Sequence, residues 1–210
     1  MVDYNEMNQS FYKKASSSKN ILRNWFHNSR QEIVARHVKK FYKAGQTIAD
    51  LGCGNVLWNT KLLPVIGVDI NEKFLDYNLS QKTISKKIIS PVEKVNLPDE
   101  SCDIIILTEV LEHLTDPDAA LKEVYRLLKI GGIIICSVPY DTFFSLWKPL
   151  FAVQCIYRGY LLNENYYKER CGHINNFSPN SIGQIFKRNK FSIIKQINHS
   201  FLTIFTIARK

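Results

Sequence analysis

The stretch Ile48-Ala49-Asp50-Leu51-Gly52-Cys53-Gly54 joins a short apolar run, an acid and two glycines one residue apart. It predicts a strand that ends in a glycine-rich turn, where missing side chains let backbone N–H groups approach a ligand. A second apolar run, 65–68, ends in Asp69. An acid at the end of the second strand is placed to bind the two hydroxyls of a ribose. Together the two runs predict a site for an adenosine-type ligand.

Two common nucleotide-binding turns are disfavoured by the residues that follow. A nicotinamide-dinucleotide fingerprint would have a third glycine at position 57, which is Leu57. A phosphate-binding loop would have a lysine directly after its last glycine, and Gly54 is followed by Asn55. The ligand is therefore expected to be of another adenosine-containing kind.

Strand-like and helical segments alternate from residue 47 to residue 140. The apolar runs predict strands at 47–51, 65–69, 87–90, 102–107 and 133–138. Between them, the patterns predict helices at 56–63, 71–79 and 116–129, the last beginning with Asp116 as its N-cap and Pro117 in its first turn. Such alternation predicts a parallel sheet with helices on both faces.

The last third predicts a different strand connection. A helix should begin at Ser178-Pro179, and strands are expected at 191–194 and 201–207. The link between these strands is too short for a parallel crossover, so one strand near the C-terminus should be antiparallel. We therefore predict an α/β fold, a three-layer α/β/α sandwich around a mostly parallel, seven-stranded sheet.

The length of 210 residues suits a single domain, 1–210, with four segments. A helical cap (1–45) precedes a ligand-binding core (46–140), and a helix with a strand pair (178–210) closes the chain. Between them, 141–177 interrupts the alternation with the aromatic stretch 143–151, which is either a lid over the site or a packed helical excursion. In the cap, 23–30 mixes aromatic and basic groups, as in a substrate lip or an amphipathic helix.

Cysteine use and the polar N-terminus favour a cytoplasmic protein. The number of cysteines is odd and no pair is spaced C-x-x-C: Cys53, Cys102, Cys136, Cys155 and Cys171. This pattern argues against a disulfide framework and against a structural metal. The first residues do not resemble a signal peptide, and no long charge-free apolar stretch suggests a membrane span.

The net charge of +9 is unevenly distributed along the chain. Residues 1–48 contribute +6, residues 49–140 contribute −4 and residues 141–210 contribute +7. The basic flanks either serve solubility or meet an anionic partner, such as a nucleic acid, a phosphorylated metabolite or an anionic lipid surface.

Five segments in order resemble the motifs of the class I (Rossmann-like) S-adenosylmethionine (SAM)-dependent methyltransferases, especially the type 11 and ubiquinone-biosynthesis-like members. They are DLGCG at 50–54, GVDIN at 67–71, LPDESCD at 97–103, EVLEHL at 109–114 and LLKIGG at 127–132. The resemblance is strong over about 45–140. It implies a methyltransferase (EC 2.1.1.-) with SAM as cofactor and S-adenosylhomocysteine as product.

The resemblance also implies which residues hold the cofactor. The turn after the first strand would hold the methionine part of the cofactor; its residues are Asp50, Gly52, Cys53 and Gly54. Asp69 would hold the ribose, and Ile70 with either Val92 or Glu93 would hold the adenine. Thr108 and Glu109 would line the methionine end. Two positions depart from the family pattern. Val56 stands where a third glycine is common and Pro91 where an acid is usual, which leaves the cofactor affinity open.

Methyl transfer needs mainly positioning of the acceptor, and it needs a base only when the acceptor loses a proton. His173, in the segment 172–179, resembles a histidine near the substrate mouth of related enzymes and is the candidate base; otherwise it is a structural loop histidine. Glu109, Glu112 and His113 would lie close together on a helix. Without a third well-placed ligand beside them, we predict no metal site.

Three functions remain open. The first is methyl transfer to a small-molecule or lipid-like acceptor, favoured by the apolar segment 143–162. The second is methylation of RNA, suggested by the basic flanks. The third is a methyltransferase-like binding or scaffold protein without turnover, suggested by Val56 and Pro91. The oligomeric state is open as well.

Overall fold

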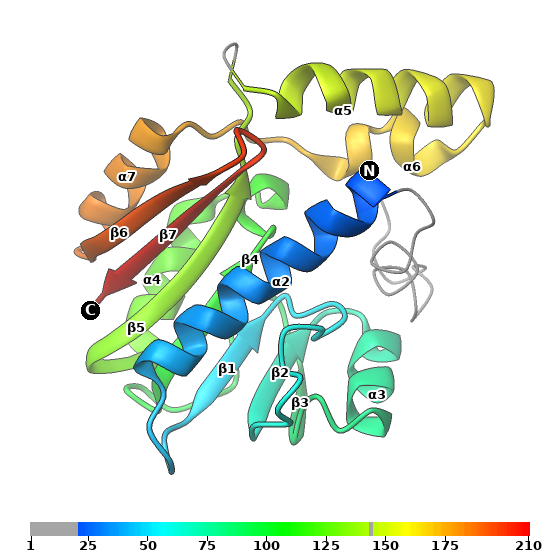
Figure 1. The fold of residues 1–210 in the computed structure, drawn as a ribbon. Coiled ribbons are helices and arrows are strands. Elements are labelled where there is room, and N and C mark those ends of the chain that lie inside the picture. Colours follow the sequence, from blue (N-terminus) through cyan, green and yellow to red (C-terminus); the bar gives the residue numbers. More distant parts are fainter. Residues whose placement is uncertain (1–20, 143–144) are drawn as a thin grey trace.

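A computed structural model describes residues 21–142 and 145–210, so the predictions for residues 1–20 and for Phe143 and Phe144 lie outside the described part. A seven-stranded sheet forms the centre, in the order β3-β2-β1-β4-β5-β7-β6 (Figure 1). Its strands are β1 (Ile48–Leu51), β2 (Val65–Asp69), β3 (Lys86–Ile89), β4 (Cys102–Thr108), β5 (Leu128–Pro139), β6 (Ser192–His199) and β7 (Thr203–Arg209). The predicted strands are all present, and β5 begins earlier than expected.

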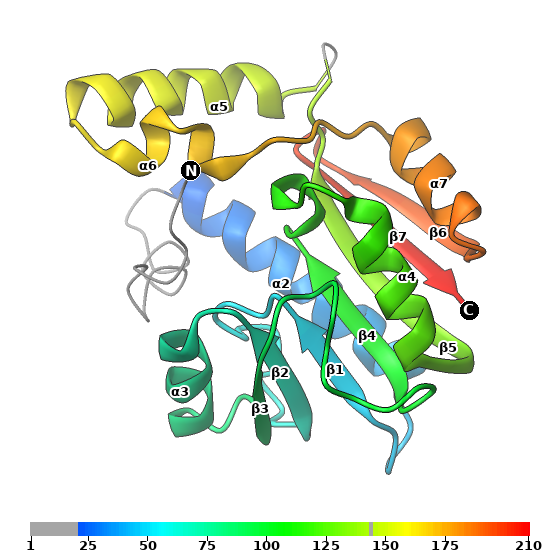
Figure 2. The ribbon, with the colours of Figure 1, turned by 180° about the vertical axis from the view of Figure 1, so that it is seen from behind.

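Helices cover both faces of the sheet, which confirms the three-layer fold (Figure 2). On one face, α2 (Ile21–Phe41) and α3 (Glu72–Ser80) contribute Val34, Val38 and Leu75 to one buried cluster. On the other, α4 (Pro117–Leu127) and α7 (Pro179–Arg188) contribute Leu121 and Phe186 to a second cluster. Among the described helices, none is both long enough and apolar enough to cross a membrane.

The central strand β4 shows why the apolar runs predicted strands correctly. Ile104 and Ile106 belong to the cluster beneath α2, whereas Ile105 and Leu107 belong to the cluster beneath α4. Successive side chains of a strand point to opposite faces, so a strand buried on both faces is apolar at every position. Cys102 and Cys136 are packed in the sheet as buried free thiols.

The C-terminal strands have the predicted directions. β7 lies between β5 and β6 and is antiparallel to both, so it is the one strand that runs against the rest of this sheet. The helix starts are also as predicted. The Asp116 carboxylate accepts the Ala119 N–H at 3.1 Å, and Ser178 forms a capping box with Ser181.

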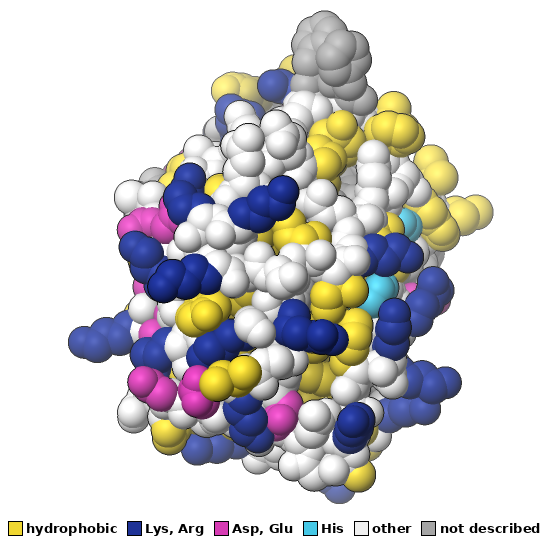
Figure 3. All heavy atoms as spheres, turned by 90° about the vertical axis from the view of Figure 1, so that its left-hand side faces the viewer, with side chains coloured by type: hydrophobic (Ala, Val, Ile, Leu, Met, Phe, Trp, Pro, Cys, Tyr) yellow, Lys and Arg dark blue, Asp and Glu magenta, His cyan; other side chains and the backbone are white. Residues whose placement is uncertain are grey.

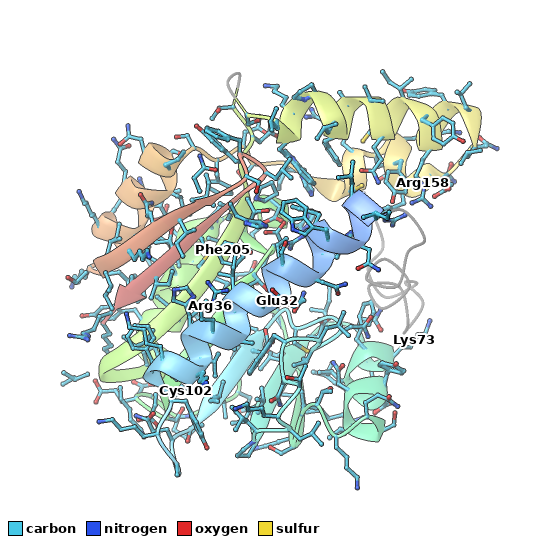
Figure 4. All side chains as sticks on the ribbon, in the orientation of Figure 1. Glu32, Arg36, Lys73, Cys102, Arg158 and Phe205 are labelled. Atoms are coloured by element: carbon cyan, nitrogen blue, oxygen red, sulfur yellow. The ribbon has the colours of Figure 1, made fainter. Side chains whose placement is uncertain are left out.

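Residues 147–172 form a set of short helices above the carboxyl ends of the parallel strands (Figure 1). They are α5 (Trp147–Cys155), the π-helical segment Ile156–Leu161, α6 (Asn165–Lys168) and the 3₁₀ turn Arg170–Gly172. Figure 4 shows Arg158 in this insertion and Cys102 at the opposite end of the sheet. The helical character of the insertion is observed, and its action as a lid over the site stays a prediction.

The helix predicted at 56–63 is wrong, because these residues form turns and bends. The Asn59 side chain holds the loop by accepting the Leu63 N–H at 2.9 Å and donating to the Leu63 carbonyl at 2.9 Å. From α3, the Asn78 side chain accepts the Val56 N–H at 3.1 Å and donates to the Gly54 carbonyl at 2.6 Å. Such side-chain bonds give the backbone an alternative to the helical ladder.

The same loop buries an acid of β1. Trp58 turns inward, and its Nε1–H donates to the Asp50 carboxylate at 2.7 Å. Asp50 is only 3% exposed. Burial raises the pKa of Asp50 to about 8, and the Trp58 bond only partly opposes that shift.

The turn after β1 requires glycine at position 52 for two reasons, its left-handed backbone conformation and its lack of space for a Cβ. Comparing substitutions at Gly52 and Gly131 separates the two effects. Gly52 has φ +65°, and an added Cβ would lie 2.6 Å from Val110 Cγ2; Gly131 has φ +80° with nothing within 4 Å. We expect Gly131→Ala to lower the free energy of unfolding by about 1 kcal/mol from backbone strain. Gly52→Ala should lower it by about 3 kcal/mol, because overpacking adds to the strain. Urea unfolding measures both, Val110→Ala should partly rescue Gly52→Ala, and equal losses would contradict the prediction.

The raised pKa of Asp50 predicts how stability depends on pH. The unfolded chain loses this proton near pH 4, whereas the native protein keeps it up to about pH 8. The stabilisation is therefore complete below about pH 4 and is lost as the pH rises to about 8, by about 1.4 kcal/mol per pH unit. Asp50→Asn cannot titrate, so its free energy of unfolding should rise relative to that of the wild type by about 4 kcal/mol from about pH 5 to 8. Parallel pH profiles in urea unfolding would refute this assignment.

Candidate functional site

The carboxyl ends of β1, β2, β4 and β5 meet at one edge of the sheet. β1 pairs in parallel with both β2 and β4. After β1 the chain therefore continues to β2 on one side of β1, and it later returns to form β4 on the other side. In open α/β sheets, ligands bind in the crevice at such a switch point. The predicted cofactor residues lie in or soon after the ends of β1 to β4: Asp50, Gly52, Cys53, Gly54, Asp69, Ile70, Val92, Glu93, Thr108 and Glu109.

The structure joins the turn after β1 directly to the acid at the end of β2. The Asp69 carboxylate accepts the Gly54 N–H at 2.8 Å and the Asn71 N–H at 2.9 Å. Cys53 donates its N–H to the Val68 carbonyl at 3.0 Å. Burial raises the pKa of Asp69, and these backbone bonds act against the rise. Each carboxylate oxygen has further acceptor capacity, so Asp69 can also receive hydroxyl groups.

The remaining adenine-side residues differ in exposure. Ile70, directly after Asp69, is 44% exposed and offers an apolar surface at the strand end. Val92 packs into the core cluster beneath α4, so only its backbone is available to a ligand, and Glu93 is half-buried. Val56 is buried in the cluster beneath α2. Its side chain therefore packs in the core.

Glu109, directly after β4, is held by two partners. Its carboxylate accepts the Ser137 hydroxyl at 2.7 Å and pairs with the Arg30 guanidinium from α2 at 3.1 Å. Glu109 has φ +56°, a left-handed conformation that is unusual for a residue with a side chain. Strained backbone of this kind concentrates at functional sites. Thr108 is half-buried beside it and pairs with Ser137 across the strands.

Aromatic rings from α2 and the insertion lie over these strand ends. Phe26 of α2 approaches Trp147 of α5 at 6.1 Å between ring centroids. Trp147 stacks on Phe151 at 5.0 Å, and the His173 ring lies parallel to Phe151 at 5.0 Å. The mixed aromatic and basic face of α2 thus contacts the insertion through Phe26, while Arg30 reaches Glu109.

The insertion also brings His173 to the turn after β4. His173 contacts His113 edge to face at 4.8 Å, and His113 Nε2 lies 3.8 Å from the Glu112 carboxylate. Burial lowers the pKa of His173 to about 3 and also lowers that of His113. Burial, followed by the nearby Glu109 charge, raises the pKa of Glu112 well above its usual range.

This cluster is what sequence reasoning missed. Glu112, His113 and His173 were each singled out, but the two histidines are far apart in the chain and nothing local indicates that they meet. Ser137 and Trp58 also escaped notice, since a strand serine and a loop tryptophan carry no motif. The role of His173 as a base stays a prediction, and so low a pKa makes its imidazole a weak proton acceptor at neutral pH.

Comparison with known proteins agrees with this geometry. Residues 49–136 match the family model described as "Methyltransferase domain". Malonyl-[acyl-carrier protein] O-methyltransferase of Yersinia pestis is 33% identical over 97 residues, which are 44% of this chain and 36% of that protein. Demethylmenaquinone methyltransferase of Staphylococcus epidermidis is 26% identical over 161 residues, covering 70% of this chain and 66% of that protein. The chain thus spans between about a third and two thirds of these curated relatives.

Solved structures share the fold over almost the whole chain. A SAM-dependent methyltransferase from Thermotoga maritima has a TM-score of 0.65 at 17% identity and covers 97% of this chain and 100% of that one. A second, from Aquifex aeolicus, has a TM-score of 0.64 at 18% identity and covers 97% and 99%. The matched family model and the curated relatives identify residues 49–136 as a methyltransferase domain, and the solved structures show that the chain has the fold of SAM-dependent methyltransferases.

Proposed function

We propose that the chain binds SAM at the ends of β1, β2 and β4 and transfers its methyl group to an apolar or amphipathic acceptor. The observation that carries the proposal is the Asp69 carboxylate, fixed at the strand end by the Gly54 and Asn71 N–H groups beside exposed Ile70. This is an acid positioned for ribose hydroxyls next to an apolar surface for a base. SAM supplies a methyl group already activated by the sulfonium, so the protein's task is binding and orientation.

The chain's own residues divide that task. Asp69 accepts the ribose hydroxyls, Ile70 packs on the adenine, and the turn 52–54 contacts the methionine part. Glu109, tied to Ser137 and Arg30, presents a fixed carboxylate at the same edge. Electrostatic groups held in place in this way need no rearrangement during the reaction. The contacting rings of Phe26, Trp147 and Phe151 would keep water from the strand ends.

The nature of the acceptor is inferred from the insertion. One side of the continuous helix formed by α5 and the π-helical segment is apolar and exposed, with exposed fractions from 54% to 72%: Leu146, Leu150, Val153, Tyr157, Tyr160 and Leu161. Phe151 and Cys155, on its other side, are buried. An exposed apolar stripe of this kind is suited to a lipid interface or an apolar ligand. The relative from Staphylococcus epidermidis is named for demethylmenaquinone, which agrees with such an acceptor.

Methylation of RNA is the alternative that the charge distribution favours. Figure 3 looks onto the edge formed by β6 and α7, where most of the charged side chains in view are Lys and Arg. Some of them already have partners, since Arg188 pairs with Asp118 and Lys210 with Glu100. Lysines on an edge strand also prevent pairing with other chains. We therefore rank RNA below an apolar acceptor; a salt-sensitive RNA mobility shift would reverse that order.

Cofactor binding is tested by titrating SAM into the protein in a calorimeter. Asp69→Asn should weaken binding by about tenfold or more, because the charge-assisted bonds to the ribose become neutral ones. Asp76→Asn makes the same change on an exposed acid of α3 and should leave the affinity unaltered. If the wild type shows no heat of SAM binding even at millimolar concentration, the proposal fails.

The acceptor class is tested by sedimentation with vesicles of phosphatidylcholine and phosphatidylglycerol. The wild type should bind, and Leu150→Ser combined with Val153→Ser should weaken binding by about tenfold or more through lost apolar contact. Ile130→Ser removes an apolar side chain that is 84% exposed at the far end of β5, and it should have no effect. Equal binding by all three proteins, or none by the wild type, would argue against an amphipathic acceptor delivered at a lipid surface.

A further inference from the structure

The Glu112 carboxylate occupies an unusual position in the turn after β4. The residue is 1% exposed, and neither of its side-chain oxygens has a hydrogen-bond partner within the described residues. Removing an ionised carboxylate from water without a compensating partner costs several kcal/mol. Either a proton or a cation must therefore accompany this group in the folded protein.

Two imidazoles converge on the same carboxylate. One ligand atom each from Glu112, His113 and His173 can be chosen so that all three lie within 4.8 Å of one another. Ligand atoms round one ion with bonds of about 2.1 Å are about 3 to 4 Å apart. Small side-chain rotations would therefore bring the three groups onto a common ion.

The two histidines are held in suitable states. His113 Nδ1 lies 3.2 Å from the Gly172 carbonyl. A carbonyl only accepts, so Nδ1 carries the proton and Nε2, the nitrogen on the Glu112 side, has the lone pair. Metal-binding histidines typically donate their second N–H to a backbone carbonyl or a carboxylate in this way. His173 is fixed by its ring contacts with Phe151 and Trp147.

Backbone hydrogen bonds build the cluster across two distant segments. The Ile174 and Asn175 N–H groups both donate to the Glu112 carbonyl, at 2.9 and 3.0 Å. The Asn175 side chain donates to the Leu111 and Leu114 carbonyls at 3.1 and 2.6 Å. These four bonds lock the chain after His173 onto the turn that carries Glu112 and His113. The proximity of the three groups is thus fixed by tertiary hydrogen bonds of the fold.

We propose that Glu112, His113 and His173 form a binding site for a divalent transition-metal ion of the Zn²⁺ type. Two imidazoles and one carboxylate suit Zn²⁺ and its neighbours in the transition series, whereas Mg²⁺ and Ca²⁺ prefer oxygen ligands alone. Three protein ligands leave at least one coordination position for water or another oxygen ligand. Metal binding at this site is tested separately from the proposed methyl transfer, because it is measured without a methyl acceptor.

The test uses the untagged 210-residue chain, freed of metal with a chelator. Calorimetry should show a single Zn²⁺ per chain, and Co²⁺ should produce the visible absorption of a protein-bound ion. Glu112→Gln keeps the shape of the side chain and removes its charge, and His173→Phe keeps the aromatic stack and removes the ligand. Each should weaken Zn²⁺ binding by at least about 100-fold, since even changes outside the ligand set cost about 10- to 100-fold.

His199→Phe is the matched control. His199 is likewise partly buried among aromatic rings, contacting Trp25 and Phe205, but it lies outside the cluster. It should leave Zn²⁺ affinity unchanged. Absence of saturable Zn²⁺ binding by the wild type, or full binding by both cluster variants, would overturn the proposal.

A measurement on the wild type alone covers the case in which a variant fails to fold. X-ray absorption of the Zn²⁺-loaded protein should show the scattering of two imidazoles and oxygen in the remaining positions. Sulfur ligands, or a single imidazole, would exclude the site. Because neither experiment uses SAM, a negative result here leaves the SAM titration to decide the proposed function separately.

Discussion

The hydrogen bond from the Gly54 amide to the Asp69 carboxylate joins the end of β1 to the end of β2, and the geometry of the site depends on it. It holds the glycine turn and the acid together at the sheet edge, and the carboxylate oxygens keep further acceptor capacity. In many α/β folds a helix after the first strand performs this task through its N-terminus. Here a loop replaces that helix, and the Asn78 side chain from α3 holds it.

That replacement has consequences beyond the turn. A loop can deliver Trp58 inward to Asp50, so the acid of β1 is buried and bonded from within. Val56 is likewise turned into the core beneath α2. The residue that departs from the family's glycine pattern is therefore accommodated by packing in the core.

The sheet and most helices were predictable because their signals are local. β4 is apolar at successive positions because both of its faces are covered. The capping side chains of α4 and α7 belong to the residues that directly precede these helices in the sequence. The loop at 56–63 was not predictable, because its helical pattern is overridden by Asn78, which comes from another element. The Glu112 cluster escaped for the same reason, because tertiary hydrogen bonds such as those of Ile174 and Asn175 bring His173 to it.

Four acids crowd the carboxyl ends of β1, β2 and β4, and their different partners explain the division of the site. Asp50 accepts the Trp58 N–H, and Asp69 accepts backbone N–H groups. Glu109 has Arg30 and Ser137 as partners, whereas the Glu112 carboxylate has no hydrogen-bond partner within the described part of the chain. Proximity of like charges disfavours ionising them all at once. A cation beside Glu112 would relieve this repulsion, and so would a cationic cofactor near Asp50 and Asp69. The acidic strand ends of an otherwise basic chain agree with both proposals, because each of them brings positive charge to this edge of the sheet.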